Sequence, residues 1–127
     1  MIDIKELRIG NWVSACDGSR WMVETIKPET ISGYMYSNNL LNDVQEKNRS
    51  VEIHDENLNP IPLSEKLLLK CRFEPRNSGI KTYYNPLLEL DHDFKLMRVD
   101  YNIQVKSLHQ LQNLYFDLTG QELEVDL

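Results

Sequence analysis

Runs of strand-forming residues open the chain, and they lie on both sides of Asp17-Gly18: Trp12 to Cys16 before the pair and Arg20 to Ile26 after it. An Asp-Gly pair between such runs is typical of a β-hairpin, because Gly adopts positive φ without a Cβ clash. Pro28 ends the second strand, since proline has no N–H for a ladder. We therefore expect a twisted N-terminal hairpin, which would also suit the start of an SH3-like partial barrel.

Residues 29–59 are less regular, and only two short stretches in them, Ile31 to Tyr36 and Val51 to Ile53, have strand character. A turn or hinge is expected over Asn57 to Pro60. A helix is then expected from Glu65 to about Arg72. Ser64 is a suitable N-cap, Leu63 and Leu68 occupy the hydrophobic-staple positions, and three consecutive leucines predict a helix that is buried over more than half of its circumference.

The stretch from Ile80 to Val105 has the spacing of an antiparallel meander, with four expected strands: Ile80 to Tyr84, Leu87 to Leu90, Phe94 to Val99 and Tyr101 to Val105. A last helix is expected from Ser107 to Thr119, with a capping box of Ser107 and Gln110 and a terminating Gly120. Five apolar residues of this helix fall within about 120° of arc and predict a core stripe: Leu108, Leu111, Leu114, Tyr115 and Leu118. The tail 121–127 is expected to be an edge strand or frayed.

These elements predict one α+β domain over residues 1–127. It combines an N-terminal twisted β-hairpin or SH3-like partial barrel, a short buried helix, an antiparallel β-meander and a C-terminal amphipathic helix packed on the sheet. The 127 residues are 41% hydrophobic and 27% charged, as in ordinary globular proteins, and do not suggest a second core.

No apolar run exceeds three residues, whereas a bilayer span needs about twenty. The first residues have no export signal, so we expect a cytoplasmic protein without a membrane partner. Cys16 and Cys71 belong to no metal or redox spacing and are expected to be small core residues.

The net charge of −6 disfavours a nucleic-acid partner, because phosphate neutralisation supplies most non-specific affinity. Four acids and no Lys or Arg follow residue 116, and the rest of the chain is nearly neutral. Exposed aromatic residues on a sheet could still stack unpaired bases. Arg20 beside Trp21 and Lys81 near Tyr83 are the cations closest in sequence to such rings. The aromatic candidates are Trp12, Trp21, Tyr34, Tyr36, Tyr83, Tyr84 and Tyr101.

Three segments, taken in order, resemble a family of small uncharacterised proteins of bacteria and their phages: Leu7-Arg8-Ile9-Gly10-Asn11-Trp12 near the start, Pro60-Ile61-Pro62-Leu63-Ser64, and the stretch from His109 to Gly120. The resemblance implies a phage or mobile-element origin and carries no activity. The chain departs from the family pattern before Phe73, where Gly is expected and Arg72 stands, and at Asp117, where Ala is common.

Beside the predicted leucine stripe, the last helix carries a second face of His109, Gln112 and Phe116. An imidazole, an amide and an aromatic ring offer hydrogen bonds and a flat apolar surface, so this face is a candidate contact for a protein partner. The alternative is structural: Phe116 would pack under a loop while the two polar side chains satisfy local backbone groups.

No catalytic, cofactor or metal site is expected. Asp91-His92-Asp93 and His54-Asp55-Glu56 have the right ligand types, but no further histidine at ligand spacing completes either. Neither a nucleophile elbow nor a glycine-rich phosphate loop is present. The leading hypothesis is a non-catalytic interaction or accessory protein; the alternatives are a nucleic-acid-associated protein that uses an SH3-like sheet, and an enzyme with an unrecognised site.

Overall fold

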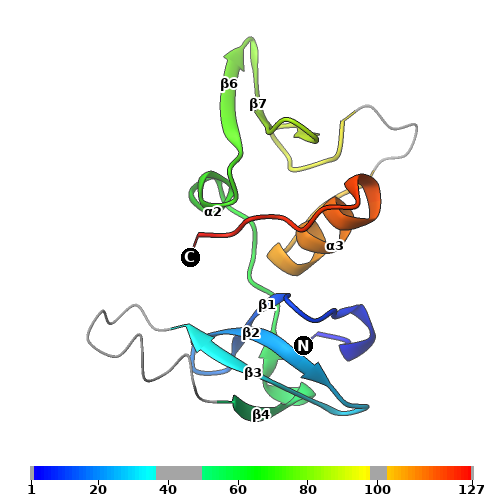
Figure 1. Ribbon diagram of the computed structural model, residues 1–127. Helices are drawn as coiled ribbons and strands as arrows, with labels where there is room; N and C mark the ends of the chain where they lie inside the picture. The colour runs from blue at the N-terminus through cyan, green and yellow to red at the C-terminus, as the bar shows by residue number, and fades with distance from the viewer. Residues whose placement is uncertain (1, 37–49, 98–102, 127) are drawn as a thin grey trace. The chain divides into compact units, whose positions relative to one another are not determined.

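The computed structural model describes residues 2–36, 50–97 and 103–126 (Figure 1). The chain divides into two compact units, Met1–Ile61 and Pro62–Leu127. The boundary directly follows the segment that was expected to form a turn or hinge. The single-domain organisation stays a prediction.

The first unit is built around an antiparallel sheet of five strands in the order β4-β3-β2-β1-β5. Its strands are β1 (Trp12–Ala15), β2 (Arg20–Ile26), β3 (Thr30–Tyr36), β4 (Ser50–His54) and β5 (Leu58–Asn59), with 3-10 turns at η1 (Ile4–Glu6) and η2 (Asp55–Asn57). Because β4 and β5 are edges, the described strands do not close into a barrel. The short strand β5 was not expected, since its asparagine and the proline after it suggested only a turn.

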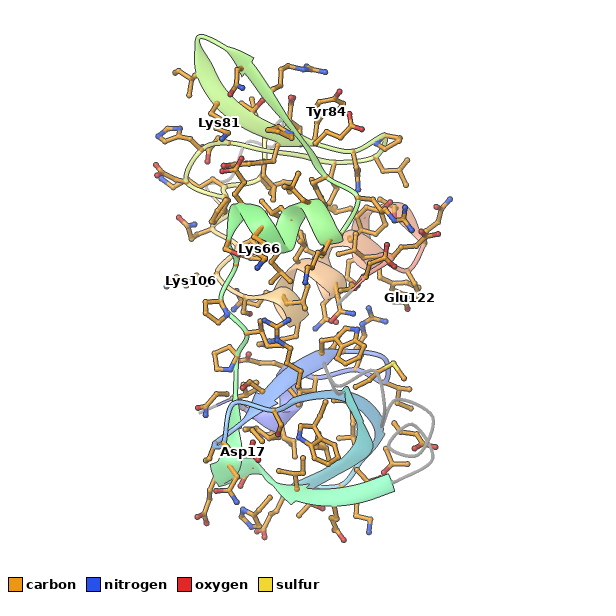
Figure 2. All side chains as sticks on the ribbon, turned by 90° about the vertical axis from the view of Figure 1, so that its left-hand side faces the viewer. Asp17, Lys66, Lys81, Tyr84, Lys106 and Glu122 are labelled. Atoms are coloured by element: carbon orange, nitrogen blue, oxygen red, sulfur yellow. The ribbon has the colours of Figure 1, made fainter. Side chains whose placement is uncertain are left out.

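The hairpin of β1 and β2 confirms the prediction at Asp17-Gly18. Trp12 pairs with Met22 across it, and Gly18 has φ +84°. The carboxylate of Asp17, labelled in Figure 2, accepts a hydrogen bond from the Ser19 N–H at 2.9 Å. Hydrogen bonds from Ser19 to the charged form lower the pKa of Asp17, so the acid stabilises the turn in its ionised state.

Alternate residues of the strands fill one core in this unit. Val13, Val23 and Ile31 are almost fully buried, and Trp21 lies with them. The N-terminal segment packs into the same cluster through Ile2, Ile4 and Leu7. The period of two that places β-strand side chains on alternating faces accounts for this core.

The second unit combines two helices with a three-stranded antiparallel sheet in the order β6-β7-β8. Its elements are α2 (Glu65–Lys70), β6 (Glu74–Ser78), β7 (Ile80–Tyr84), β8 (Glu89–Leu90) and α3 (Leu108–Thr119). With the five-stranded sheet of the first unit, this confirms the α+β class. Among the described residues, no helix has the length and apolar character needed to cross a bilayer.

The meander differs from its prediction at both ends. Strand β6 was missed because Pro75, which removes a backbone donor, argues against a strand; here Pro75 pairs with Tyr83 on an edge strand, where that donor is not needed. Between β8 and Val105, the described residues form two isolated bridges instead of strands, Leu90 with Leu96 and Lys95 with Gln104. The rest of the two later strands that were expected falls on residues 98–102, outside the described residues.

Helix α2 begins as predicted, with the Ser64 hydroxyl accepting a hydrogen bond from the Leu67 N–H at 3.2 Å. It ends in a Schellman arrangement, in which the Phe73 N–H reaches the Leu68 carbonyl at 3.0 Å. This geometry puts Arg72 at φ +67°, in the left-handed region that Gly adopts without a steric penalty. The expectation of burial over more than half of the helix was wrong for Leu69, which is 49% exposed.

Helix α3 also has the predicted ends, and Gly120 closes it at φ +73°. The capping box was wrong: the Gln110 amide accepts from the Lys106 N–H at 3.0 Å, and the Ser107 hydroxyl makes no capping bond. The core stripe was right for Leu108, Leu111 and Tyr115. It was wrong in the last two turns, where Leu114 is partly exposed and Leu118 is 51% exposed.

The C-terminal tail lies against the end of α2 and does not form a strand. The Asp126 N–H bonds to the Lys70 carbonyl at 2.8 Å, and Arg72 forms ion pairs with Asp126 at 2.9 Å and with Glu124 at 3.5 Å. Cys71 is fully buried. Desolvation, with a smaller contribution from the Asp126 charge, raises the pKa of its thiol to about 12, so it is inert as a nucleophile. Cys16 is exposed, contrary to expectation.

Candidate functional site

The predicted partner-binding face of α3 is not an open surface. His109 and Gln112 are 2% and 4% exposed, and Phe116 alone is accessible at 38%. The His109 Nδ1 lies 3.2 Å from the Ser107 hydroxyl, a local contact between two side chains, whereas the structural alternative expected contacts with backbone groups. Partner binding through His109, Gln112 and Phe116 together stays a prediction, and it would require the first two to become accessible.

The two histidines with acidic neighbours are not buried: His92 lies on an exposed turn, and His54 is the partly exposed last residue of β4. Asp91 accepts hydrogen bonds from the Asp93 and Lys95 N–H groups, both at 2.9 Å, so its carboxylate is used to hold the turn. His54 Nδ1 lies 2.9 Å from Asp55 at the start of η2. In the three described ranges, no group of three His, Cys, Asp or Glu side chains could hold a metal ion.

The aromatic candidates of the second unit differ in burial among the described residues, and Tyr101 lies outside them. Trp21 and Tyr83 are buried, and Tyr83 packs against Phe94 with ring centroids 5.6 Å apart. Tyr84, the next residue along β7, is partly exposed. Tyr84 is therefore the tyrosine of this sheet, among the described residues, that lines a cavity.

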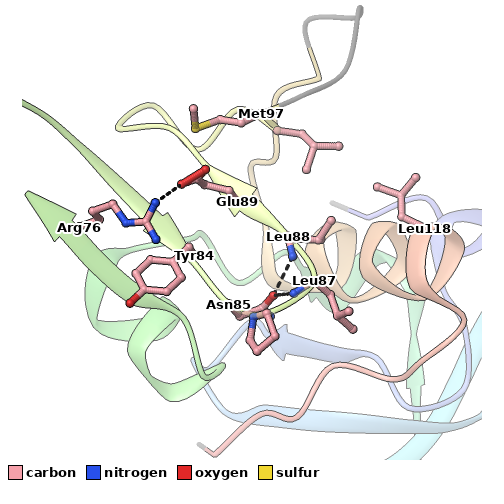
Figure 3. Close-up of a pocket in the computed structure, with 10 residues that line it drawn as sticks. Arg76, Tyr84, Asn85, Leu87, Leu88, Glu89, Met97 and Leu118 are labelled. Carbon is pink, nitrogen blue, oxygen red and sulfur yellow. Dashed lines mark hydrogen bonds and ion pairs between the residues drawn. The ribbon is translucent and has the colours of Figure 1, made fainter. Parts of the chain in front are cut away.

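That cavity is a half-open pocket of about 390 Å³ within the second unit (Figure 3). Its lining comes from β6, β7, β8, the turn between the last two strands, the segment after β8, and α3: Arg76, Tyr84, Asn85, Pro86, Leu87, Leu88, Glu89, Leu96, Met97 and Leu118. Its volume lies in the range of small-ligand sites, at the lower end.

One side of the pocket is polar and held in place by contacts among its own residues. The Arg76 guanidinium lies over the Tyr84 ring, 4.3 Å from its centroid, and forms an ion pair with Glu89 at 3.6 Å. The Tyr84 hydroxyl donates to Glu74 at 3.0 Å. The ring contact and the ion pair together orient the Arg76 guanidinium and its N–H donors.

The other side is apolar, and much of it is open to water. Leu87 and Leu118 are 46% and 51% exposed. Figure 3 shows Leu118 approaching from α3 on the side opposite Arg76 and Tyr84. The Asn85 side chain accepts hydrogen bonds from the Leu87 and Leu88 N–H groups at 2.9 and 2.8 Å. These two bonds fix the turn that carries Leu87.

The pocket was not predicted from the sequence. Tyr84 was noted as an aromatic candidate, but its partner Arg76 lies on the strand that Pro75 concealed. No local signal could have located the pocket, because the leucine stripe continues through Leu118 in the sequence and the exposure of that end is visible only in the structure.

Comparison with protein-family models, with curated proteins and with solved structures finds no match for this chain.

Proposed function

We propose that the protein is a non-catalytic interaction module, and that the pocket of the second unit binds a short segment of a partner polypeptide. The observation that carries the proposal is the pairing of two half-exposed leucines, Leu87 and Leu118, with an oriented arginine, Arg76, across one half-open pocket. The accessory role in a phage or mobile element, expected from the resemblance, is part of the same proposal.

The composition of the lining favours binding over chemistry. Its titratable side chains are Arg76, Tyr84 and Glu89, and the last is already paired with the first. Acyl or phosphoryl transfer would call for a nucleophile beside a base, or an acid beside a base. Apolar side chains with a few fixed polar groups are instead the composition of a recognition site.

The openness of the pocket favours a polypeptide over a small enclosed ligand. Leu87 and Leu118 remain exposed at its rim, so an occupant that covers them must extend beyond the cavity. An extended peptide does this with one side chain in the pocket and its neighbours over the rim. Burying the two leucines would supply most of the affinity, because apolar area removed from water is the main favourable contribution.

The test is selection of peptides from a random ten-residue phage library on the immobilised full chain. Selected peptides are then titrated against the wild type and against Leu118→Ser. We expect Leu118→Ser to weaken binding by about tenfold, since it removes an apolar contact of about 1–2 kcal/mol. Leu118 is half exposed, and a serine there remains hydrated, so the variant should fold.

Leu69→Ser is the matched control, because Leu69 is a leucine of similar exposure, 49%, that lies on α2 and does not line the pocket. It should bind the selected peptides like the wild type. A library that yields no binders, or binders that Leu118→Ser does not weaken, would refute the proposal.

A further inference from the structure

The polar side of the pocket carries charges of both signs. Arg76 contributes one positive charge, and the Glu89 carboxylate lies 3.6 Å from it. Glu89 is well shielded from water, with 16% of its side chain exposed, whereas Arg76 is 51% exposed. A second carboxylate, Glu74, is bonded to the hydroxyl of the tyrosine on which Arg76 lies.

An acidic ligand gains little from this arrangement. A carboxylate placed against Arg76 would be attracted by one guanidinium and repelled by Glu89 at nearly the same distance, and Coulomb energies of opposite sign and similar separation largely cancel. A basic ligand faces the same cancellation with the signs reversed. The unit as a whole has eight Lys and Arg against ten Asp and Glu, which adds no strong field of either sign.

A neutral amide group can bind the Arg76 guanidinium and the Glu89 carboxylate at the same time. A peptide group presents an acceptor, its C=O, next to a donor, its N–H. The guanidinium supplies N–H donors in a fixed fork, and a carboxylate supplies acceptor oxygens. Arg76 is held over Tyr84 at 4.3 Å, so its donors are already oriented before a ligand arrives.

We propose that the Arg76–Glu89 pair binds the backbone amide of an uncharged peptide segment, while Leu87 and Leu118 pack against one apolar side chain of that segment. The Arg76 guanidinium donates to the peptide C=O and the Glu89 carboxylate accepts from a peptide N–H. This inference rests on the proposed function and specifies the ligand: a neutral segment with an exposed leucine-like side chain, bound with little dependence on salt.

Three peptides that share a central leucine and carry neutral, acidic or basic neighbours test it: Gly-Ser-Leu-Ser-Gly, Gly-Asp-Leu-Asp-Gly and Gly-Lys-Leu-Lys-Gly, each acetylated and amidated. Binding to the full chain is followed by the backbone amide resonances of residues 87–90 in nitrogen-15 NMR spectra. We expect the serine peptide to bind about fivefold more tightly than either charged one. Its Kd should change by less than about twofold between 50 and 500 mM NaCl, because no net charge is neutralised.

Two variants should reverse the preference. Glu89→Gln keeps an acceptor oxygen but leaves Arg76 without its counter-charge, so the aspartate peptide should become the tightest by about fivefold. Arg76→Gln should favour the lysine peptide in the same way. Glu65→Gln is the control, because Glu65 is paired with Lys81 at 2.7 Å in the same unit and does not line the pocket; it should leave the order unchanged.

The outcomes separate the two proposals. If the aspartate or the lysine peptide binds the wild type most tightly, or if Glu89→Gln leaves the order of the three affinities unchanged, the inference that Arg76 and Glu89 bind a backbone amide is refuted while peptide binding stands. If none of the three peptides shifts the resonances, the inference is refuted as well, and if the phage library also yields no binder that depends on Leu118, the interaction function fails with it.

Discussion

Adding a single methyl group at Gly33 should disrupt the first unit. Gly33 lies in β3 opposite Val23, beside the irregularity in register between Val23 and Thr25. A Cβ at this position would stand 2.0 Å from the carbonyl oxygen of Met22, 2.9 Å from its carbonyl carbon and 3.3 Å from the Val23 Cα. All three are backbone atoms of β2, so no side-chain rotation can relieve the contact.

The cost follows from what must move. Separating the methyl group from the Met22 oxygen requires a shift of β2 by more than about 1 Å, because a normal carbon–oxygen contact is about 3.3 Å. Trp21 and Val23 on the same strand are buried core residues, and they would shift with it. Overpacking usually costs about 1–3 kcal/mol, and we expect about 3 kcal/mol or more here because the methyl group meets backbone atoms only.

That loss is large for a unit of this size. At about 0.05–0.15 kcal/mol per residue, the stretch Met1–Ile61 has roughly 3–9 kcal/mol of stability. The two tryptophans of the chain, Trp12 and Trp21, both lie in this unit. Tryptophan fluorescence during urea unfolding therefore reports on it, and with an m-value of about 1 kcal/mol/M the midpoint should fall by about 3 M.

Gly18→Ala is the matched control. Gly18 has φ +84°, but a Cβ added there would meet nothing within 4 Å, so this change carries only the conformational cost, about 1 kcal/mol. The steric reasoning would be refuted if Gly33→Ala lowered the urea midpoint no more than Gly18→Ala does.

Three further predictions concern Arg72, the two cysteines and the leucines of α3. Arg72→Gly should raise stability by about 0.5–1 kcal/mol in 1 M NaCl, where the exposed ion pairs of Arg72 are screened, and by less at low salt; urea unfolding followed by circular dichroism at both salt concentrations checks this. A thiol reagent at pH 8 should label exposed Cys16 at once and buried Cys71 only on unfolding. Because folding raises the pKa of the Cys71 thiol, burial of the neutral thiol contributes fully to stability below pH 9, and this contribution is lost as the pH rises toward about 12. Leu111→Ala should cost about 2–5 kcal/mol and Leu118→Ala under about 1 kcal/mol in thermal unfolding, since the first is fully buried and the second half exposed.

The sequence by itself determined the features whose causes lie within a few residues. The N-terminal hairpin, the start of α2 at Ser64 and the end of α3 at Gly120 were all predicted, and the structure confirms each. Hairpin turns and helix ends depend on local φ preferences and on hydrogen bonds between near neighbours. Such signals are present in the printed sequence.

Only the tertiary structure decided which faces are covered. The stripe of α3 continues to Leu118 in sequence, yet burial stops before it, and His109 and Gln112 are buried although their residue types suggested a surface. Strand β6 forms despite Pro75 because it lies at an edge. The pocket is lined by Arg76, Glu89 and Leu118 from three different elements. Residues so far apart in the sequence come together only through the packing of the whole unit, which no local pattern determines.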